Sequence, residues 1–385
     1  MSRWARQILF GDIDAMYASA AACADPALAG KIVAVGGQAP RGIITSASYA
    51  ARRFGVRSAM PTGQALRLCP ELTVVPPDFS LYRTLHDRMR IAVDRLLPIV
   101  EWTSIDEFYA DATDVQTRYP DPVALGQAVK SAIRDETGLT ATIAISATKI
   151  VAKVAADAHK PNGLVIVPVE EQAAFLASRP IGALPGIGPK SQKQLEAWGI
   201  RLVADLFEPR HERTLRRLWG RRVPAMQALA RAEDAEPVVP DRDARSIGHE
   251  TTFEQDTDDV RDLGETLRGF LARLAHDLRR DGLAAGGYTI KLKDRRFRIT
   301  TRQRRFPSPL DYEAEMWRHI EPELRGLITP GTRYRLAGIS LSGLVPATGT
   351  LFDTQRPKAL AALDELIDRY GSGVIRLGGL PSKDD

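Results

Sequence analysis

Apolar positions recur along the first part of the chain with two different periods. Short β-branched or apolar runs bounded by Gly, Pro or Asp predict strands at residues 7–13, 32–36, 72–75, 100–103, 108–111 and 141–145. Ala-rich runs and apolar residues at helical spacing predict helices at residues 15–23, 49–54, 61–68, 81–97, 122–137 and 150–158. Strands and helices in this mixed order predict an α+β domain.

The pattern changes twice further along the chain. Residues 179–219 predict short helices joined by a Pro-Gly turn, and residues 233–243 become rich in Pro and charge, which favours a linker. Beyond the linker, apolar spacing predicts a separate domain and a last helix, with elements at 260–280, 288–293, 334–341 and 357–370. A chain of 385 residues also exceeds the roughly 250–300 residues at which single cores stop growing. The sequence therefore predicts an α+β multidomain protein.

Composition narrows the classes of function. Lys and Arg outnumber Asp and Glu by 53 to 48, and the pI is near 9.2. This excess permits nucleic-acid binding, although a solvated basic surface would give the same balance. Cys23 and Cys69 stand in no metal-ligand spacing and are too few for a disulfide framework, so both are expected to be small buried hydrophobes. Neither a signal peptide nor a membrane-spanning run of ~20 apolar residues is present. A cytoplasmic protein without a membrane partner is expected.

Acidic residues cluster at two points that are far apart in the sequence. Asp12 and Asp14 lie at the end of the first predicted strand, and Asp106 and Glu107 lie at the tip of a predicted hairpin. If adjacent strands bring the two points together, their carboxylates would repel each other, and a pair of Mg²⁺ ions would relieve that repulsion. Taken alone, however, either point could be a solvated turn. The surrounding residues decide between the two interpretations.

Four runs of residues surround these acids. They are Gly11-Asp12-Ile13-Asp14-Ala15-Met16-Tyr17-Ala18-Ser19, Tyr49-Ala50-Ala51-Arg52-Arg53-Phe54-Gly55-Val56-Arg57-Ser58-Ala59-Met60-Pro61, Ser104-Ile105-Asp106-Glu107, and Ala152-Lys153-Val154-Ala155-Ala156-Asp157 with Lys160-Pro161-Asn162-Gly163. These runs resemble the Y-family DNA polymerases, and among them the DNA polymerase IV class. They follow the order and spacing of that family, and the resemblance covers about residues 5 to 345. One departure is the Ala-rich helix at 18–22, where the family often has a Glu.

The resemblance implies a right-hand polymerase with palm, fingers and thumb and a C-terminal little-finger domain. The implied bounds are a palm at 1–14 and 78–169, fingers at 15–77, a thumb with a helix-hairpin-helix at 170–236, a linker at 237–247, a little finger at 248–345 and a tail at 346–385. The implied activity is template-directed DNA synthesis of low fidelity across damaged templates. Such an enzyme adds dNMP to a primer 3′-hydroxyl, releases pyrophosphate and has no proofreading.

The resemblance also assigns catalytic roles. Asp12, Asp106 and Glu107 would be the metal ligands, and the backbone carbonyl of Ile13 would complete one metal site. The cofactor would be two Mg²⁺ ions, with Mn²⁺ as the alternative. Asp14 would support the site without being a ligand. Tyr17 matches the steric gate that excludes the ribose 2′-hydroxyl, and its alternative role is core packing.

The nucleotide contacts are implied in the same way. Tyr49 and Arg52 lie three residues apart on one helical face and match the pair that grips the triphosphate of the incoming dNTP. Arg offers a planar fork to phosphate oxygens. Lys160 would be a further cation there, and Ser46 a nearby hydroxyl. Lys149 and Lys153 are expected to serve packing and backbone contacts.

Two regions are candidates for binding primer–template DNA. The segment 184–190 resembles a helix-hairpin-helix, with Gly186, Gly188 and Lys190 as the residues near a phosphate, although an ordinary helix–helix turn is the alternative. The basic segment 291–305 could neutralise phosphates or could be a solvated face. Its candidate contacts are Lys291, Lys293, Arg295, Arg296, Arg298, Arg302 and Arg304.

Partners and rival functions complete the predictions. Leu351 and Phe352 weakly resemble a sliding-clamp peptide, in which Thr348 replaces the family's usual Gln. A monomer that binds primer–template DNA and dNTP is expected. The alternatives are a catalytically inactive, polymerase-like accessory DNA-binding protein, a nucleotide cyclase with a similar palm, and a mutagenic UmuC-like subunit that needs partner proteins. The retained carboxylates argue against the first, and the duplex-binding features argue against the second.

Overall fold

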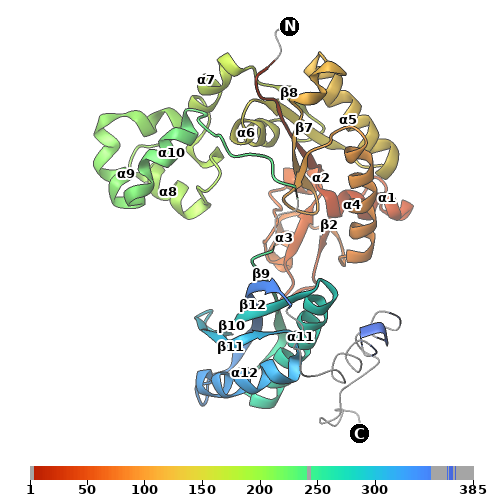
Figure 1. Cartoon of the computed structure of the whole chain (residues 1–385), viewed down its shortest axis with the longest axis vertical. Helices are drawn as coiled ribbons and strands as arrows, with labels where there is room; N and C mark the ends of the chain where they lie inside the picture. The colour runs from red at the N-terminus through yellow and green to blue at the C-terminus, as the bar shows by residue number, and fades with distance from the viewer. Residues whose placement is uncertain (1–3, 241–243, 348–361, 363, 367–368, 370–385) are drawn as a thin grey trace. The chain divides into compact units, whose positions relative to one another are not determined.

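The computed structural model describes residues 4–240, 244–347, 362, 364–366 and 369. The chain forms two compact units, Met1–Arg242 and Asp243–Asp385 (Figure 1). Each unit combines sheets and helices, so the predicted α+β class is confirmed. Within the described residues, no helix combines the length and apolar character that crossing a membrane requires.

The first unit is built on a five-stranded sheet in the order β5-β6-β1-β7-β8. Its central strand, β1 (Ile8–Ile13), is buried along its whole length and runs antiparallel to both neighbours. Gly11 is required there, because a Cβ at this position would lie 2.4 Å from the Phe108 ring. The other strands are β5 (Val100–Trp102), β6 (Glu107–Asp111), β7 (Ala141–Ser146) and β8 (Leu164–Ile166).

Helices cover both faces of this sheet, as the complete burial of β1 requires. Leu9 and Ile13 join the core cluster that contains the apolar faces of α4 (Phe79–Asp94) and α5 (Pro122–Thr137). Phe10 points to the opposite face and packs in the cluster that contains α6 (Lys149–His159). The end of β1 is therefore held rigidly from two sides, which fixes the position of Asp12.

A smaller sheet in the order β3-β2-β4 follows β1 in the chain. Its core includes Cys69, which is buried as predicted. The prediction for Cys23 is wrong, because this residue is exposed near the end of α1. The elements of this region are α1 (Met16–Ala24), β2 (Val33–Gly36), β3 (Ile44–Ala47), α2 (Tyr49–Arg53), α3 (Thr62–Leu68) and β4 (Thr73–Val75).

The rest of the first unit is helical. Its core packs against α6 and includes Leu195, Leu215 and Met226. The helices are α7 (Gln172–Ala177), α8 (Pro189–Ala197), α9 (Glu212–Trp219) and α10 (Val223–Ala230).

The Pro-rich segment after α10 lies against the first unit. The backbone N–H of Val239 donates to Glu101 at 2.9 Å, and the Asp234 carboxylate accepts from the Ile150 N–H at 3.1 Å. Glu101 also forms a buried ion pair with Lys149. Side chains of the first unit therefore anchor the start of the segment that sequence composition marks as a linker.

The second unit is a four-stranded antiparallel sheet in the order β11-β10-β12-β9, with α11 (Val260–Arg280) and α12 (Glu313–Leu327) packed on one face. The bounds of α11 match the prediction, whereas β9, β11 and α12 were not predicted. The expected helix at 357–370 falls largely outside the described residues. The strands are β9 (Ser246–Thr257), β10 (Leu283–Asp294), β11 (Ile299–Leu310) and β12 (Tyr334–Pro346).

Candidate active site

The pairing of β1 with β6 brings the two acidic points of the sequence together. Asp12 and Glu107 are directly opposite each other in the antiparallel register, so their side chains share one face of the sheet. The backbone N–H of Ile13 donates to the carbonyl of Asp106 at 3.0 Å. The strand end near residue 12 and the turn near residue 106 are therefore in direct contact.

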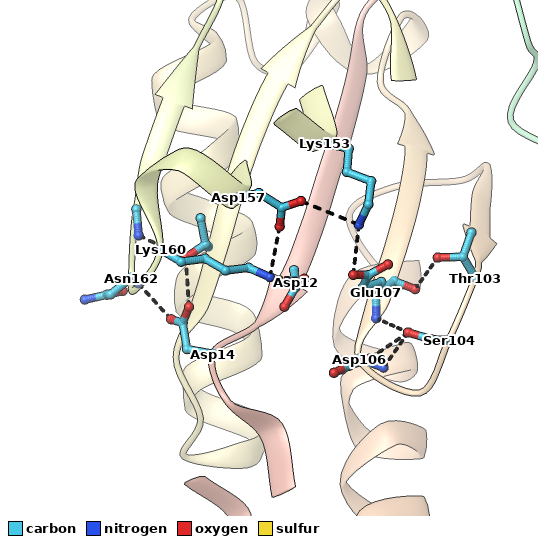
Figure 2. Close-up of polar contacts among 12 residues, drawn as sticks. Asp12, Asp14, Thr103, Ser104, Asp106, Glu107, Lys153, Asp157, Lys160 and Asn162 are labelled. Atoms are coloured by element: carbon cyan, nitrogen blue, oxygen red, sulfur yellow. Dashed lines mark hydrogen bonds and ion pairs between the residues drawn. The ribbon is translucent and has the colours of Figure 1, made fainter. Parts of the chain in front are cut away.

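Asp106 directly precedes Glu107 in this turn, but its carboxylate has a local partner. The Ser104 hydroxyl donates to it at 2.6 Å and accepts from the backbone N–H of Glu107 at 3.0 Å (Figure 2). Among the described residues, no three His, Cys, Asp or Glu side chains converge as a ready metal cluster. Of the three predicted ligands, the structure thus pairs Asp12 with Glu107 and leaves Asp106 bonded to Ser104.

Two lysines neutralise the paired acids. Lys160 forms an ion pair with Asp12, and the ammonium of Lys153, on α6, lies 2.9 Å from Glu107. Asp157 is shared between them, 3.2 Å from Lys160 and 3.9 Å from Lys153 (Figure 2). Lys153 packs over the Phe10 ring, 4.7 Å from its centroid, as expected, but its ion pair with Glu107 was not predicted. Lys153 and Asp157 are four residues apart and therefore lie on one helical face. This spacing indicates from the sequence that Lys153 takes part in an ion pair.

Burial makes the charge of Asp12 costly. It raises the pKa of Asp12 to about 7, a shift that Lys160 reduces and the neighbouring Glu107 increases. Burial also opposes ionisation of Glu107, but Lys153, a hydrogen bond with Asp12 and the charge of Lys160 together outweigh it and hold the pKa of Glu107 below its usual value. The pair thus presents concentrated negative charge in a partly desolvated place, which added positive charge would stabilise.

Asp14 lies behind this pair and is almost fully buried. Its carboxylate accepts hydrogen bonds from the hydroxyls of Thr140 and Thr142, at 2.9 and 2.8 Å, and from the backbone N–H of Asn162 at 2.8 Å. It therefore ties the end of β1 to β7 and to the loop that begins with Lys160. Asp14 acts on Asp12 through that loop, since the loop carries the cation that contacts Asp12.

The acids open into a cavity of about 240 Å³. The hydroxyl of Tyr49 is buried there, and the part of the chain that the structure describes offers it no hydrogen-bond partner. Arg52 packs over the Tyr49 ring at 4.5 Å, which confirms that the two share one face of α2. The cavity is lined by Asp12, Ile13, Ala15, Met16, Tyr17, Thr45, Ser46, Tyr49, Arg52, Ser58, Asp106, Glu107 and Lys160.

Every predicted catalytic and nucleotide-binding residue is in that lining, and two polar residues were missed. Thr45 and Ser58 contribute hydroxyl-bearing side chains to the wall. Ser58 stands inside one of the four motif runs, so its position was a usable signal. Thr45 gave none, because an exposed Thr within a short strand is common on any surface.

Tyr17 forms one wall of the cavity and is backed by other aromatic rings. It stacks on Tyr82 with the ring centroids 4.1 Å apart and nearly parallel, and Phe79 packs edge-on at 6.4 Å. Both supporting residues come from α4, and the sequence did not single them out. Their packing fixes the Tyr17 ring in one orientation, as either a gate or a core residue would need.

The predicted helix-hairpin-helix turn precedes α8. Gly186 has a positive φ of 90°, which only Gly adopts without strain. Gly188 is the N-cap of α8 and supplies no side chain to cap the helix, so the first N–H groups of α8 are left for another acceptor. Lys190 is exposed in the first turn.

The basic segment of the second unit divides between two faces of the sheet. Arg302 and Arg304 lie opposite Ile290 and Tyr288, on the face that packs against the helices, and both pair with Glu323 of α12. Lys291 and Lys293 are on the open face, where Lys291 pairs with Glu250.

The remaining basic candidates lie at the hairpin tip. Arg298 pairs with Asp294 at 2.7 Å. For Lys293, Arg295 and Arg296 the structure gives no acidic partner within its described residues. Leu351 and Phe352 lie outside those residues.

Comparison with known proteins identifies the family. Residues 11–157 match the impB/mucB/samB family, residues 169–200 its HHH motif and residues 244–353 its C-terminal domain. The DNA polymerase IV of Alkalilimnicola ehrlichii is 36% identical over 89% of this chain and 96% of its own length. The chain belongs to the Y family of DNA polymerases. The DNA polymerase IV of Halorhodospira halophila is 38% identical, with the same coverage of both chains, so this Y-family member falls in the DNA polymerase IV class.

Solved structures share the fold. A Y-family DNA polymerase chimera of Dbh and Dpo4 superposes with a TM-score of 0.80 at 23% identity, covering 89% of this chain and all of its own. DinB from Sulfolobus solfataricus gives a TM-score of 0.62 with the same coverage and identity. The predicted right-hand fold with a little-finger domain is therefore confirmed for this Y-family polymerase.

Proposed function

We infer that this chain is a template-directed DNA polymerase of low fidelity that carries out translesion synthesis. It adds dNMP to the 3′-hydroxyl of a primer, releases pyrophosphate and does not proofread. The observation that carries this inference is the pairing of Asp12 with Glu107 at the base of a cavity lined by Arg52 and Lys160. An inactive accessory protein has no use for this charged arrangement, and nothing in the comparisons favours that alternative.

The residues present fit divalent cations. Carboxylate and carbonyl oxygens are available from Asp12, Ile13, Asp106 and Glu107, and hard oxygen donors without His or Cys are the set that Mg²⁺ or Mn²⁺ prefers. Burial already raises the pKa of Asp12 to about 7, so added positive charge at this place favours its ionised form. When bound, two such cations stabilise the charge of an in-line phosphoryl transfer. We propose Mg²⁺ as the physiological ion.

The other side of the cavity suits a nucleotide. The free hydroxyl of Tyr49 and the guanidinium of Arg52 face the same space, and both can bond phosphate oxygens. Lys160 carries a charge that either Asp12 or a triphosphate can balance. Ser46 is a further contact, and Tyr17, fixed by Tyr82, would meet the sugar as the steric gate.

The proposed DNA contacts lie in both units. Gly186, Gly188 and Lys190 would approach a backbone phosphate through the free N–H groups of α8. On the second unit, the open face of the sheet carries Lys293, whose ammonium would neutralise a backbone phosphate of the duplex. We further propose that the enzyme is monomeric and cytoplasmic. Leu351 and Phe352 would bind a sliding clamp.

Primer extension with the purified full chain tests this function. The wild type should add the templated dNMP when each dNTP is offered alone with Mg²⁺. Asp106→Asn should reduce the rate by about 100-fold or more, because metal-assisted charge stabilisation is worth several kcal/mol. Asp135→Asn, an exposed acid on α5, is the matched control and should extend like the wild type. Undiminished extension by Asp106→Asn would contradict the assignment.

A further inference from the structure

The tip of the β10–β11 hairpin presents an aromatic ring to solvent. Phe297 is 65% exposed, more than any other large hydrophobic residue in the described part of the chain. Its backbone φ is 64°, in the left-handed region that bulky residues rarely adopt. Exposure and backbone conformation both disfavour Phe at this position. Strained residues of this kind cluster at binding sites.

The hairpin holds this conformation firmly. The buried carboxylate of Asp294 accepts from the backbone N–H groups of Arg296 and Arg298, at 2.8 and 3.0 Å, and from the Arg298 side chain at 2.7 Å. The backbone N–H of Phe297 donates to the Asp294 carbonyl at 2.9 Å. The ring is therefore presented in a preorganised position, which lowers the entropic cost of binding a partner.

The charges around the ring select the partner. The guanidinium of Arg335 packs 5.2 Å from the ring centroid. Arg295 and Arg296, which precede the ring in the sequence, are exposed, and the structure gives neither an ion pair within its described residues. An exposed aromatic ring next to two such cations suits a flat apolar group joined to anions. An unpaired nucleobase between two phosphates has this composition, whereas the bases of a duplex already cover one another's faces.

We propose that Phe297, with Arg295 and Arg296, is a stacking site for an unpaired base of single-stranded DNA. The ring stacks on the base, and the two arginines neutralise the flanking phosphates. The site deepens the proposed function by adding a contact to the unpaired strand of a template. It rests on that function only because a polymerase's template would supply the single strand.

Binding of fluorescein-labelled oligodeoxythymidylate to the full chain, followed by anisotropy, tests the site. Phe297→Gly removes the ring at a φ that Gly tolerates, so the variant should melt within a few degrees of the wild type. Its affinity for the oligonucleotide should fall by roughly 5-fold or more, and Phe297→Trp should restore it. The matched control is Phe207→Ala, which removes an exposed ring with Arg231 5.5 Å from its centroid and should bind like the wild type.

Salt dependence separates the ring from the charges. Phe297→Gly should leave the slope of log affinity against log salt unchanged, while the double variant Arg295→Gln/Arg296→Gln should lower it by about 1.4, at ~0.7 per phosphate on a single strand. Wild-type affinity in Phe297→Gly, or an equal loss in Phe207→Ala, would overturn the proposal. Primer extension with the same preparations keeps the two inferences distinct. A wild type that binds the oligonucleotide through Phe297 but extends no primer contradicts the polymerase, not the stacking site.

Discussion

Asp12 and Glu107 lie directly opposite each other on β1 and β6, and each is paired with its own lysine. Lys153 lies in the middle of α6 and Lys160 directly follows the helix, so one helix and its C-cap neutralise both acids. Two like charges side by side in a partly buried place would otherwise favour protonation of one of them. The lysines keep the pair compatible with a folded core, and divalent cations would serve the same purpose during catalysis.

Tyr17 should control sugar selection. Replacing it with Ala removes the ring that Tyr82 holds in place, so the cavity wall retreats where a 2′-hydroxyl would fall. We expect Tyr17→Ala to raise incorporation of ribonucleotides by at least about 10-fold, within the range that one steric contact gives. Single-nucleotide primer extension with rNTP and dNTP measures this ratio. Tyr17→Phe keeps the ring and should retain selectivity, and an unchanged ratio in Tyr17→Ala would remove the gate assignment.

Asp14 should matter for both stability and nucleotide binding. Asp14→Ala leaves the buried Thr142 hydroxyl and the partly buried Asn162 N–H without their acceptor, and an unsatisfied buried group costs about 1–3 kcal/mol. The loop that positions Lys160 would then loosen, so KM for dNTP should rise. Urea denaturation and steady-state kinetics measure the two effects. Asp135→Ala, which removes an exposed acid, should change neither, and a wild-type KM in Asp14→Ala would show that the loop is positioned without it.

The buried pair of Lys149 and Glu101 should be far more important for stability than an exposed pair. Lys149→Met leaves a buried carboxylate without its cation, a change that costs about 3–5 kcal/mol. Arg95→Met breaks the exposed pair with Glu136, 3.2 Å apart, and should cost less than about 1 kcal/mol. Urea denaturation of the full chain compares the two variants. Equal small effects would mean that water reaches the Lys149 ammonium.

The two faces of β10 and β11 should differ in DNA binding. Lys293 lies on the open face, whereas Arg304 lies opposite Tyr288 and pairs with Glu323 at 2.8 Å. If a duplex lies on the open face, Lys293→Gln should lower the salt slope of binding by about 0.9, and Arg304→Gln should leave it nearly unchanged. Anisotropy titrations at several salt concentrations measure the slopes. The reverse order would place the DNA on the other face.

Much of the fold was predictable because apolar residues recur at a regular spacing along many of its helices and strands. The bounds of α11 follow from leucines at helical spacing that all face one core. The strand β11 was missed because it is an edge strand with mostly exposed residues, so it lacks the apolar alternation on which strand prediction depends. A strand partner for β10 could be expected, but its register decides which basic residues face outward. Register depends on pairing that one strand does not reveal.

The site was predictable in its members but not in its contacts. Motif spacing placed Asp12 and Glu107 together, because strand pairing follows from the fold. It could not show that Ser104 bonds the Asp106 carboxylate or that Lys153 contacts Glu107, since a side chain's choice among nearby partners depends on distances of an ångström or less. The exposure of Cys23 could not be predicted for a different reason. The Ala-rich α1 has no clear apolar face to show which side is buried.

Binding of Mn²⁺ to the full chain, followed by electron paramagnetic resonance with primer–template and a non-hydrolysable dNTP analogue present, tests the central claim most directly. We predict that Glu107→Gln and Asp12→Asn each weaken Mn²⁺ binding at least about 10-fold, because each removes an anionic oxygen donor. Asp135→Asn should bind the ion like the wild type. Wild-type Mn²⁺ affinity in Glu107→Gln would contradict the claim that these opposed acids share divalent cations.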